Sequence, residues 1–590
     1  MTTVLTLLMS NLKKWNVTHI FGIPGRPIAP LIKEMIEQDI TYVLTRHETG
    51  AGYAAGGFAL QKKNLGVAFA TAGPGGVNML TAAGQAQAHN VPVLFITGQT
   101  SAGKIGKSYS QDSSSFGADL VKMFEPVTKY SARVERGDSF ESHFRHAIER
   151  AFSGVMGPVH LSIPLDVLYE EITPFEFELP QIQHTIAANI EEAFMLIKDA
   201  KRPVFLLGKG VRSSNSYEEV FEIATKWNIP VITTGGGKGT FPTNHPISLG
   251  VYGLGGTIEA DQYLQSGIDV MIVAGSSLND MALAGFKQDF YPEKVIHFDY
   301  DPTFVGKTIS RPTLFVPGDL KRNLGKILEL TLEQGVVGHD ERLIVRELVA
   351  ASSEYTSLNQ ERTENVYENL LFSSDFVATA LDDKTIMLKE MEDFHNQRSK
   401  SLVISSASAI RTIRRNLPEY TKVFADVGSH AYYAVKHFDV YQPETFFFDD
   451  RFIAMGNGIG YAIGAKIAMN EDSQPVACIT GDGCMLMHGT EIATAVEHQA
   501  PILFFVFNNG SLDMVETGMK IWQDCPGHNV YKKPVDFVSF AEALGCKGFR
   551  CLSEDDIQMA IQFGLQSNQP TIIEIMVDPE EIPPTLKRDE

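Results

Sequence analysis

The chain has 590 residues, 44% of them hydrophobic, and a formal net charge of −21 at pH 7. This length predicts about three domains, and the negative charge argues against non-specific binding to nucleic acid or to an anionic membrane surface. The five cysteines form no Cys-x-x-Cys pair, which is typical of free thiols in a reducing compartment.

Neither a transmembrane span nor a leader peptide is evident in the sequence. The chain has no apolar run of the ~18 residues that a transmembrane helix needs. Residues 3–15 read as an amphipathic helix without the basic region and cleavage site of a signal peptide. We therefore expect a cytoplasmic protein with no membrane partner and no nucleic-acid partner.

The first block, residues 1–175, alternates strand-like and helix-like segments. Strands are expected at residues 18–21, 41–45, 66–70, 91–96 and 157–164. Such alternation with short loops predicts a doubly wound, mainly parallel sheet. Glu48 stands at the end of one strand and opens an Ala/Gly-rich helix over residues 50–60. It is either a first-turn carboxylate favoured by the helix dipole or a carboxylate that exchanges a proton with a ring nitrogen.

A linker over residues 176–190 leads to a second α/β block, residues 191–340. Its strand-to-turn units are expected at residues 203–210, 230–237, 270–275 and 295–301. The glycine-rich turns at 208–210 and 235–239 do not complete a Walker A pattern, so nucleotide binding is only weakly indicated. Residues 341–400 are more charged and polar, and we interpret them as a connector with some helix.

The third block, residues 401–578, repeats the α/β alternation. Strands are expected at residues 422–426, 445–448, 476–480, 502–507 and 570–576. The glycines at 456, 458 and 460 are followed by Tyr461 where a dinucleotide loop needs its third glycine. This departure disfavours an NAD-dependent dehydrogenase.

The segment from Gly481 to Asn509 carries the strongest chemical signal. It reads Gly-Asp-Gly, then one predicted helix over residues 485–500, then a strand that ends in Asn-Asn. The carboxyl ends of parallel strands share one edge of a sheet, where phosphates and metals bind. Asp482 and Asn509 offer the oxygen ligands that Mg2+ prefers, with phosphate oxygens as further ligands.

Taken in order, these segments resemble the thiamine-diphosphate-dependent enzymes of the acetolactate synthase and 2-oxo acid decarboxylase superfamily. The motifs that carry the resemblance are Gly481-Asp-Gly483 with Asn508-Asn509, Arg46-His47-Glu48, residues 71–76, residues 157–166, Val427-Gly-Ser-His430 and Met455. The resemblance implies three α/β domains, which bind the pyrimidine (1–175), a variable ligand (191–340) and the diphosphate (401–578). It also implies a dimer or tetramer with active sites at the interface between copies.

The resemblance also implies the roles of individual residues. Mg2+ would be held by Asp482, Asn509 and the backbone carbonyl of Ser511. Thiamine diphosphate would be bound by Gly25, Pro74, Gly428, Ser429, His430, Met455, Gly481, Gly483, Cys484 and Met514. Within that set Met455 would impose the folded shape of the cofactor, while Glu48 would bond the N1′ atom of its pyrimidine.

The implied activity is decarboxylation of a 2-oxo acid followed by carboligation to a second carbonyl compound. Two departures affect the pocket for that second substrate: Gly518 replaces the family's Trp, and its active-site Gln falls on Phe116 unless a gap brings in Gln111. His89 is either a proton-transfer residue or a loop histidine. FAD stays open at this point. Gly253-Leu-Gly-Gly-Thr257 resembles the flavin loop of the synthases, but the Phe-Asp-Asp-Arg of flavin-containing synthases is missing around residues 277–280, which argues against FAD.

Three alternatives stay open at this point. The first is a 2-oxo acid decarboxylase that does not ligate. The second is an enzyme similar to oxalyl-CoA decarboxylase or 2-hydroxyacyl-CoA lyase. The third, from another class, is a nucleotide-binding regulatory protein without catalysis, which would have no need for Glu48, Asp482 and Asn509 together.

Overall fold

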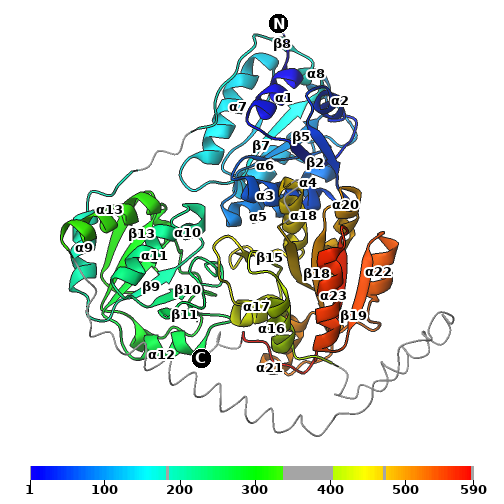
Figure 1. Cartoon of the computed structure of the whole chain (residues 1–590). Coiled ribbons are helices and arrows are strands. Elements are labelled where there is room, and N and C mark those ends of the chain that lie inside the picture. The colour runs from blue at the N-terminus through cyan, green and yellow to red at the C-terminus, as the bar shows by residue number, and fades with distance from the viewer. Residues whose placement is uncertain (1, 181–184, 336–402, 470–473, 586–590) are drawn as a thin grey trace, which may run out of the picture.

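The computed structural model describes residues 2–180, 185–335, 403–469 and 474–585, which form three lobes (Figure 1). We call them the N-terminal lobe (2–180, blue and cyan), the central lobe (185–335, green) and the C-terminal lobe (403–585, yellow to red). Each contains one six-stranded sheet in which all neighbouring strands run parallel. The predicted fold class, three doubly wound parallel sheets, is therefore confirmed. The connector predicted at 341–400 lies outside the described residues.

The sheet of the N-terminal lobe has the strand order β3-β2-β4-β5-β7-β6. Its strands are β2 (His19–Ile23), β3 (Thr41–Leu44), β4 (Gly66–Ala70), β5 (Val93–Gln99), β6 (Ser131–Arg133) and β7 (Val159–Pro164). Its principal helices are α1 (Val4–Lys14), α2 (Pro30–Glu37), α3 (Glu48–Lys62), α4 (Pro74–Asn78), α5 (Leu80–His89) and α7 (Gly137–Phe152). Every residue of β4, β5 and β7 is buried, as parallel strands covered by helices on both faces require.

The central lobe has the strand order β11-β10-β9-β12-β13-β14. Its strands are β9 (Val204–Leu207), β10 (Val231–Thr233), β11 (Ser248–Val251), β12 (Val270–Ala274), β13 (Lys294–Asp299) and β14 (Thr313–Pro317). Its main helices are α9 (Ile190–Asp199), α10 (Gly210–Ser213), α11 (Tyr217–Lys226), α12 (Ile258–Gln265) and α13 (Leu320–Glu333).

The C-terminal lobe has the strand order β16-β15-β17-β18-β20-β19. Its strands are β15 (Lys422–Ala425), β16 (Phe446–Phe447), β17 (Val476–Gly481), β18 (Ile502–Asn508), β19 (Lys547–Cys551) and β20 (Thr571–Met576). Its helices are α16 (Ser406–Asn416), α17 (Ser429–His437), α18 (Asn457–Met469), α19 (Asp482–His488), α20 (Ile492–Glu497), α21 (Asp513–Trp522), α22 (Phe537–Ala543) and α23 (Glu554–Gln566).

The single helix predicted over residues 485–500 is wrong. The chain instead forms α19, a 3-10 turn over Gly489–Glu491, and α20. Glycine is a poor helix former, and Gly489 stands at the break between the two helices. The break lets Glu491 turn its carboxylate toward the backbone of Arg46 and His47 in the N-terminal lobe.

Helices α3 and α18 lie side by side and join the N-terminal lobe to the C-terminal lobe (Figure 1). Glycines on both helices make this close approach possible. A β-carbon at Gly57 would overlap the carbonyl oxygen of Tyr461, and one at Gly464 would overlap that of Ala54. The small-residue composition of both helices, evident in the sequence, is thus used for packing between lobes.

The sheets of the N-terminal and C-terminal lobes share one strand order, and the central sheet differs from them. All three nevertheless reverse their strand order at the first strand, which indicates where ligands can bind. In each, the second strand pairs on one side of the first, and a later strand pairs on its other side. A crevice opens at this reversal, outside the carboxyl ends of the strands.

Within the described ranges, no helix is both long enough and apolar enough to cross a membrane.

Candidate functional site

A cavity of about 260 Å³ lies at the strand reversal of the C-terminal lobe, between β15 and β17. It brings together most of the residues predicted to bind the diphosphate and the metal: Gly428, Ser429, His430, Met455, Gly481, Asp482, Gly483, Cys484, Asn509, Ser511 and Met514. They lie at or after the carboxyl ends of four strands of one sheet, β15, β16, β17 and β18, so the shared edge explains their convergence. Among the described residues, none before Ser406 lines this cavity.

Asp482, Asn509 and Ser511 form a compact group of oxygen donors at the ends of β17 and β18. One carboxylate oxygen of Asp482 accepts the backbone N–H groups of Gly510 and Ser511, at 2.9 and 3.2 Å. The Asn509 side-chain oxygen accepts the Ser511 hydroxyl at 2.9 Å. Burial raises the pKa of Asp482 to about 7, and a cation beside it would favour the charged form.

This group suits Mg2+ better than a softer metal. Within the described ranges, no three His, Cys, Asp or Glu side chains gather as metal ligands. The group of Asp482, Asn509 and Ser511 offers one carboxylate with amide and carbonyl oxygens. Mg2+ typically completes such a partial protein shell with phosphate oxygens and water, so the residues present fit a metal bound together with a diphosphate.

The walls of the cavity also fit a tightly held phosphate group. The Nε2 atom of His430 is buried and has no hydrogen-bond partner within the described residues. Burial lowers the pKa of His430 to about 3, so the ring is neutral and its free nitrogen is available to a ligand. Position 483 has no room for a side chain, because a β-carbon there would lie 2.6 Å from Leu512 and 3.2 Å from Met455.

Three of the residues predicted in the N-terminal lobe, Gly25, Glu48 and Pro74, follow the ends of β2, β3 and β4. Glu48 begins α3, is partly exposed, and accepts the Asn78 side-chain amide at 2.9 Å. A β-carbon on Gly75 would lie 3.3 Å from its carboxylate. Pro74 begins α4 within the same turn. This arrangement places the Glu48 carboxylate beside the glycine-containing turn at residues 73–76.

Thr71 lies between Gly25 and Gln111, two of the predicted residues of this lobe. A β-carbon on Gly25 would overlap its side chain, so only glycine fits there. The Thr71 hydroxyl donates to the Gln111 side-chain oxygen at 3.4 Å. Phe116, the alternative position for the active-site glutamine, is 74% exposed. Of these two positions, the structure therefore brings Gln111 next to the predicted cofactor-binding turns.

Glu491 holds the turn that presents Glu48, and sequence analysis missed it. Its carboxylate accepts the backbone N–H groups of Arg46 and His47 at 2.8 and 2.7 Å. The bond joins the C-terminal lobe to the N-terminal lobe across 445 residues of sequence. In the sequence it is one of several carboxylates in a predicted helix, and no local signal distinguishes it.

Glu491→Gln is expected to remove a pH dependence of stability. Burial raises the pKa of Glu491 from 4.5 to about 7, so its stabilising contribution is complete below pH 4.5 and is lost as pH rises through 7. Between those values the melting temperature of the wild type should fall relative to that of Glu491→Gln, by the equivalent of at least about 1 kcal/mol. Thermal unfolding from pH 4.5 to 8 measures this; parallel curves for the two proteins would contradict it, and exposed Glu542→Gln is the control.

His89 is not brought into the cavity. It ends α5 and is buried, with its ring 4.5 Å from that of Tyr461 in α18. Burial lowers the pKa of His89 to about 4, so the ring is neutral. Proton transfer by His89 stays a prediction, whereas packing between lobes is what its surroundings show.

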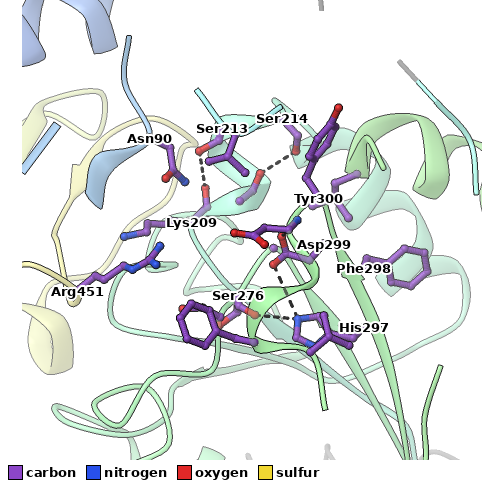
Figure 2. A pocket seen from close by; sticks show the side chains of 18 of the residues that line it. Asn90, Lys209, Ser213, Ser214, Ser276, His297, Phe298, Asp299, Tyr300 and Arg451 are labelled. Carbon is purple, nitrogen blue, oxygen red and sulfur yellow. Dashed lines mark hydrogen bonds and ion pairs between the residues drawn. The ribbon is translucent and has the colours of Figure 1, made fainter. Parts of the chain in front are cut away.

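A second cavity, of about 210 Å³, lies at the strand reversal of the central lobe. Figure 2 shows Lys209 and Arg451 on one side of it, with His297 and Tyr300 on the other. Its position at the carboxyl ends of β9, β12 and β13 is that of a nucleotide crevice. Gly253–Thr257, the loop similar to a flavin loop, does not line it. The absence of FAD stays a prediction.

Family models cover most of the chain. Residues 2–119 match "Thiamine pyrophosphate enzyme, N-terminal TPP binding domain", residues 190–327 match the "central domain" of the same enzymes, and residues 426–575 match their "C-terminal TPP binding domain". The two terminal matches contain the two groups of residues described above.

Curated relatives match over nearly the full length. The "Probable acetolactate synthase large subunit" of Methanocaldococcus jannaschii is 31% identical, with 98% of this chain and 92% of the relative covered. The "Acetolactate synthase large subunit" of Corynebacterium glutamicum is 30% identical, with 97% and 86% covered. Among solved structures, benzoylformate decarboxylase from Polynucleobacter necessarius matches with a TM-score of 0.79 at 19% identity, covering 99% of this chain and 100% of that one. The last likeness concerns the fold.

Proposed function

Because the chain belongs to the thiamine pyrophosphate enzymes, we propose that it decarboxylates a 2-oxo acid and joins the remaining fragment to a second carbonyl compound. The observation that carries this proposal is full-length similarity to proteins named acetolactate synthase. The cavity of the C-terminal lobe supports it, since it combines the oxygen donors for a metal with a glycine-lined wall.

Each residue group has a distinct task in this proposal. Asp482, Asn509 and the backbone carbonyl of Ser511 hold Mg2+, which neutralises the diphosphate. Thiamine diphosphate supplies the electron sink for loss of CO2. Glu48 holds a proton at the pyrimidine N1′ atom. Met455, whose methyl group lies close to Gly483, would contact the cofactor and impose its folded shape. The buried walls of the cavity would exclude water.

We also propose that each active site is shared by two copies of the chain. The cavity around Asp482 is lined by residues from Ser406 onward, within the part that the structure describes. Glu48 lies on the N-terminal lobe, beside Asn78 and Gly75, and does not line that cavity. A second copy can supply the missing half of each site, and twofold symmetry then gives two equivalent sites.

Mixing two inactive variants should restore activity if the sites are shared. In a mixed dimer of Glu48→Gln and Asp482→Asn chains, one site carries both substitutions and the other carries neither. Random 1:1 pairing of dissociated chains should therefore recover about a quarter of wild-type activity. Recovery is measured against each variant alone after co-refolding or co-expression. No recovery from folded, mixed dimers would show that the sites are not shared.

The departure in the second-substrate segment leaves two alternative functions open. The second-substrate segment departs from the family's pattern, because Gly518 on α21 stands at the position of the family's Trp. Trp522, one helical turn later, is 46% exposed. A decarboxylase that does not ligate, or one that acts on acyl-CoA, fits this departure. The test is CO2 release and product identification from a panel of 2-oxo acids and acyl-CoAs, with and without thiamine diphosphate and Mg2+. Ligated products from 2-oxo acids support the proposal, free aldehydes alone support the first alternative, and CO2 release from an acyl-CoA supports the second. No turnover with no cofactor binding contradicts all three.

A further inference from the structure

Asp449 is a buried carboxylate at the meeting point of the three lobes. It follows β16 in the C-terminal lobe and is 2% exposed. Lys209 of the central lobe donates to one of its oxygens at 3.2 Å, and Gln85 of the N-terminal lobe donates to the other at 2.9 Å. One side chain thus contacts a partner from each of the other two lobes.

The same carboxylate binds the backbone of the loop that follows it. The N–H groups of Arg451, Phe452 and Ile453 donate to Asp449 at 3.3, 2.9 and 3.0 Å. Gln85 extends the arrangement, because its side-chain oxygen accepts the Ala454 N–H at 3.1 Å. Four successive backbone donors are therefore fixed by two buried side chains.

This loop ends in the cofactor cavity. Ile453 and Met455 both line the cavity around Asp482. At the other end of the loop, Arg451 lines the cavity of the central lobe, where Figure 2 shows it beside Lys209. The position of Met455 is therefore set by a segment anchored outside the C-terminal lobe.

The loop also carries a strained residue. Ile453 has a φ of 53°, a left-handed conformation that is strongly disfavoured for a β-branched side chain. Such strain persists only where the surrounding structure imposes it, and it concentrates at functional sites. The hydrogen bond from the Ile453 N–H to Asp449 is the nearest constraint that can impose it.

The ion pair with Lys209 is a poor explanation for Asp449 on stability grounds alone. Burial raises the pKa of Asp449, but Lys209, His89 and the hydrogen bonds from Ile453 and Gln85 outweigh burial and hold it well below its usual range. Replacing a buried ion pair by apolar residues is often neutral for stability. Stability alone therefore does not explain a charged group at this position. Its hydrogen bonds to the backbone of residues 451–453 indicate that it holds this loop in place.

We propose that Asp449 is a positioning residue, which fixes Met455 in the cofactor cavity by holding the strained loop at Ile453. Its contacts with Lys209 and Gln85 tie this loop to the other two lobes. The inference rests on the proposed binding of thiamine diphosphate in that cavity. Asp449 touches neither cofactor nor substrate in this role. It acts through Met455.

The test compares Asp449→Ala, Met455→Ala and the double variant. Two quantities are measured: the Kd of thiamine diphosphate at saturating Mg2+ by calorimetry, and the rate at which bound cofactor exchanges its C2 proton with solvent. Asp449→Ala is expected to weaken binding and slow exchange by about tenfold each, as removal of supporting groups around a bound ligand does. In the Met455→Ala background, the same substitution should slow exchange by less than about twofold, because coupled residues are not additive.

A merely structural role gives a different pattern. It would lower the melting temperature but leave exchange by bound cofactor unchanged, and that result from a folded Asp449→Ala protein overturns the inference. Independent, multiplicative effects of Asp449→Ala and Met455→Ala also overturn it. If Asp449→Ala does not fold, Gln85→Met takes its place: it removes the bonds to Asp449 and Ala454 at similar volume, and should slow exchange about threefold. A wild type that binds no thiamine diphosphate would overturn the proposed function as well.

Discussion

Glu48→Gln is expected to slow C2 proton exchange of bound thiamine diphosphate by about 10²- to 10⁴-fold, the usual worth of a positioned acid or base. Glutamine has the same shape and can keep the contact with the Asn78 side chain, which now lies 2.9 Å from the carboxylate. It cannot hold a proton at the pyrimidine N1′ atom. Binding should change little, because the residues proposed to contact the metal and the diphosphate all lie in the C-terminal lobe.

Exchange is measured by mixing the protein and its bound cofactor with deuterated buffer, quenching at set times and following the C2 proton by NMR. Calorimetry gives the Kd of the cofactor. Glu37→Gln, on the surface of α2 beside Lys33, is the control with the same chemical change. Exchange that stays at the wild-type rate in a folded Glu48→Gln protein would remove Glu48 from this role.

Asp482→Asn is expected to weaken binding of thiamine diphosphate in the presence of Mg2+ by roughly 10²-fold or more, since even supporting groups around a metal are worth 10- to 100-fold. The substitution preserves size but removes the only charged oxygen among the three proposed metal-binding residues. It also replaces one acceptor by an amide donor near the Gly510 and Ser511 N–H groups. Metal and cofactor affinity should therefore fall together.

Calorimetric titration of the cofactor at several Mg2+ concentrations measures this loss. In the wild type, affinity should rise with Mg2+, whereas in Asp482→Asn the dependence should be weak. Asp555→Asn, an exposed residue in the first turn of α23, is the matched control. Equal affinity in wild type and Asp482→Asn would show that the metal is held elsewhere.

The central strands of the three sheets could be predicted from the sequence, as could the edge strands β3 and β16, whereas the edge strands β6 and β19 could not. β4 and β18 are continuous apolar runs because helices cover both of their faces. At the edges, β6 has three residues and β19 reads Lys-Gly-Phe-Arg-Cys, with an exposed first residue. Such segments become strands through pairing with a neighbour, and that information is not local.

The same distinction applies to the candidate site. Asp482 and Asn509 follow consecutive strands of one βαβ unit, so their proximity follows from the chain order alone. Glu491 and Asp449 matter because of contacts with residues 445 and 364 positions away. In the sequence they are ordinary carboxylates, one within a predicted helix and one after a short strand. Their roles depend on how the lobes pack, which no local pattern encodes.

The most direct test of the central claim is the stoichiometry of pyruvate conversion by the purified protein with thiamine diphosphate and Mg2+. Pyruvate consumption, CO2 release and the organic product are measured in the same reaction. A decarboxylating carboligase should consume two molecules of pyruvate for each CO2 and form one product in which the two fragments are joined. One CO2 for each pyruvate, with a free aldehyde as the sole product, would contradict the claim.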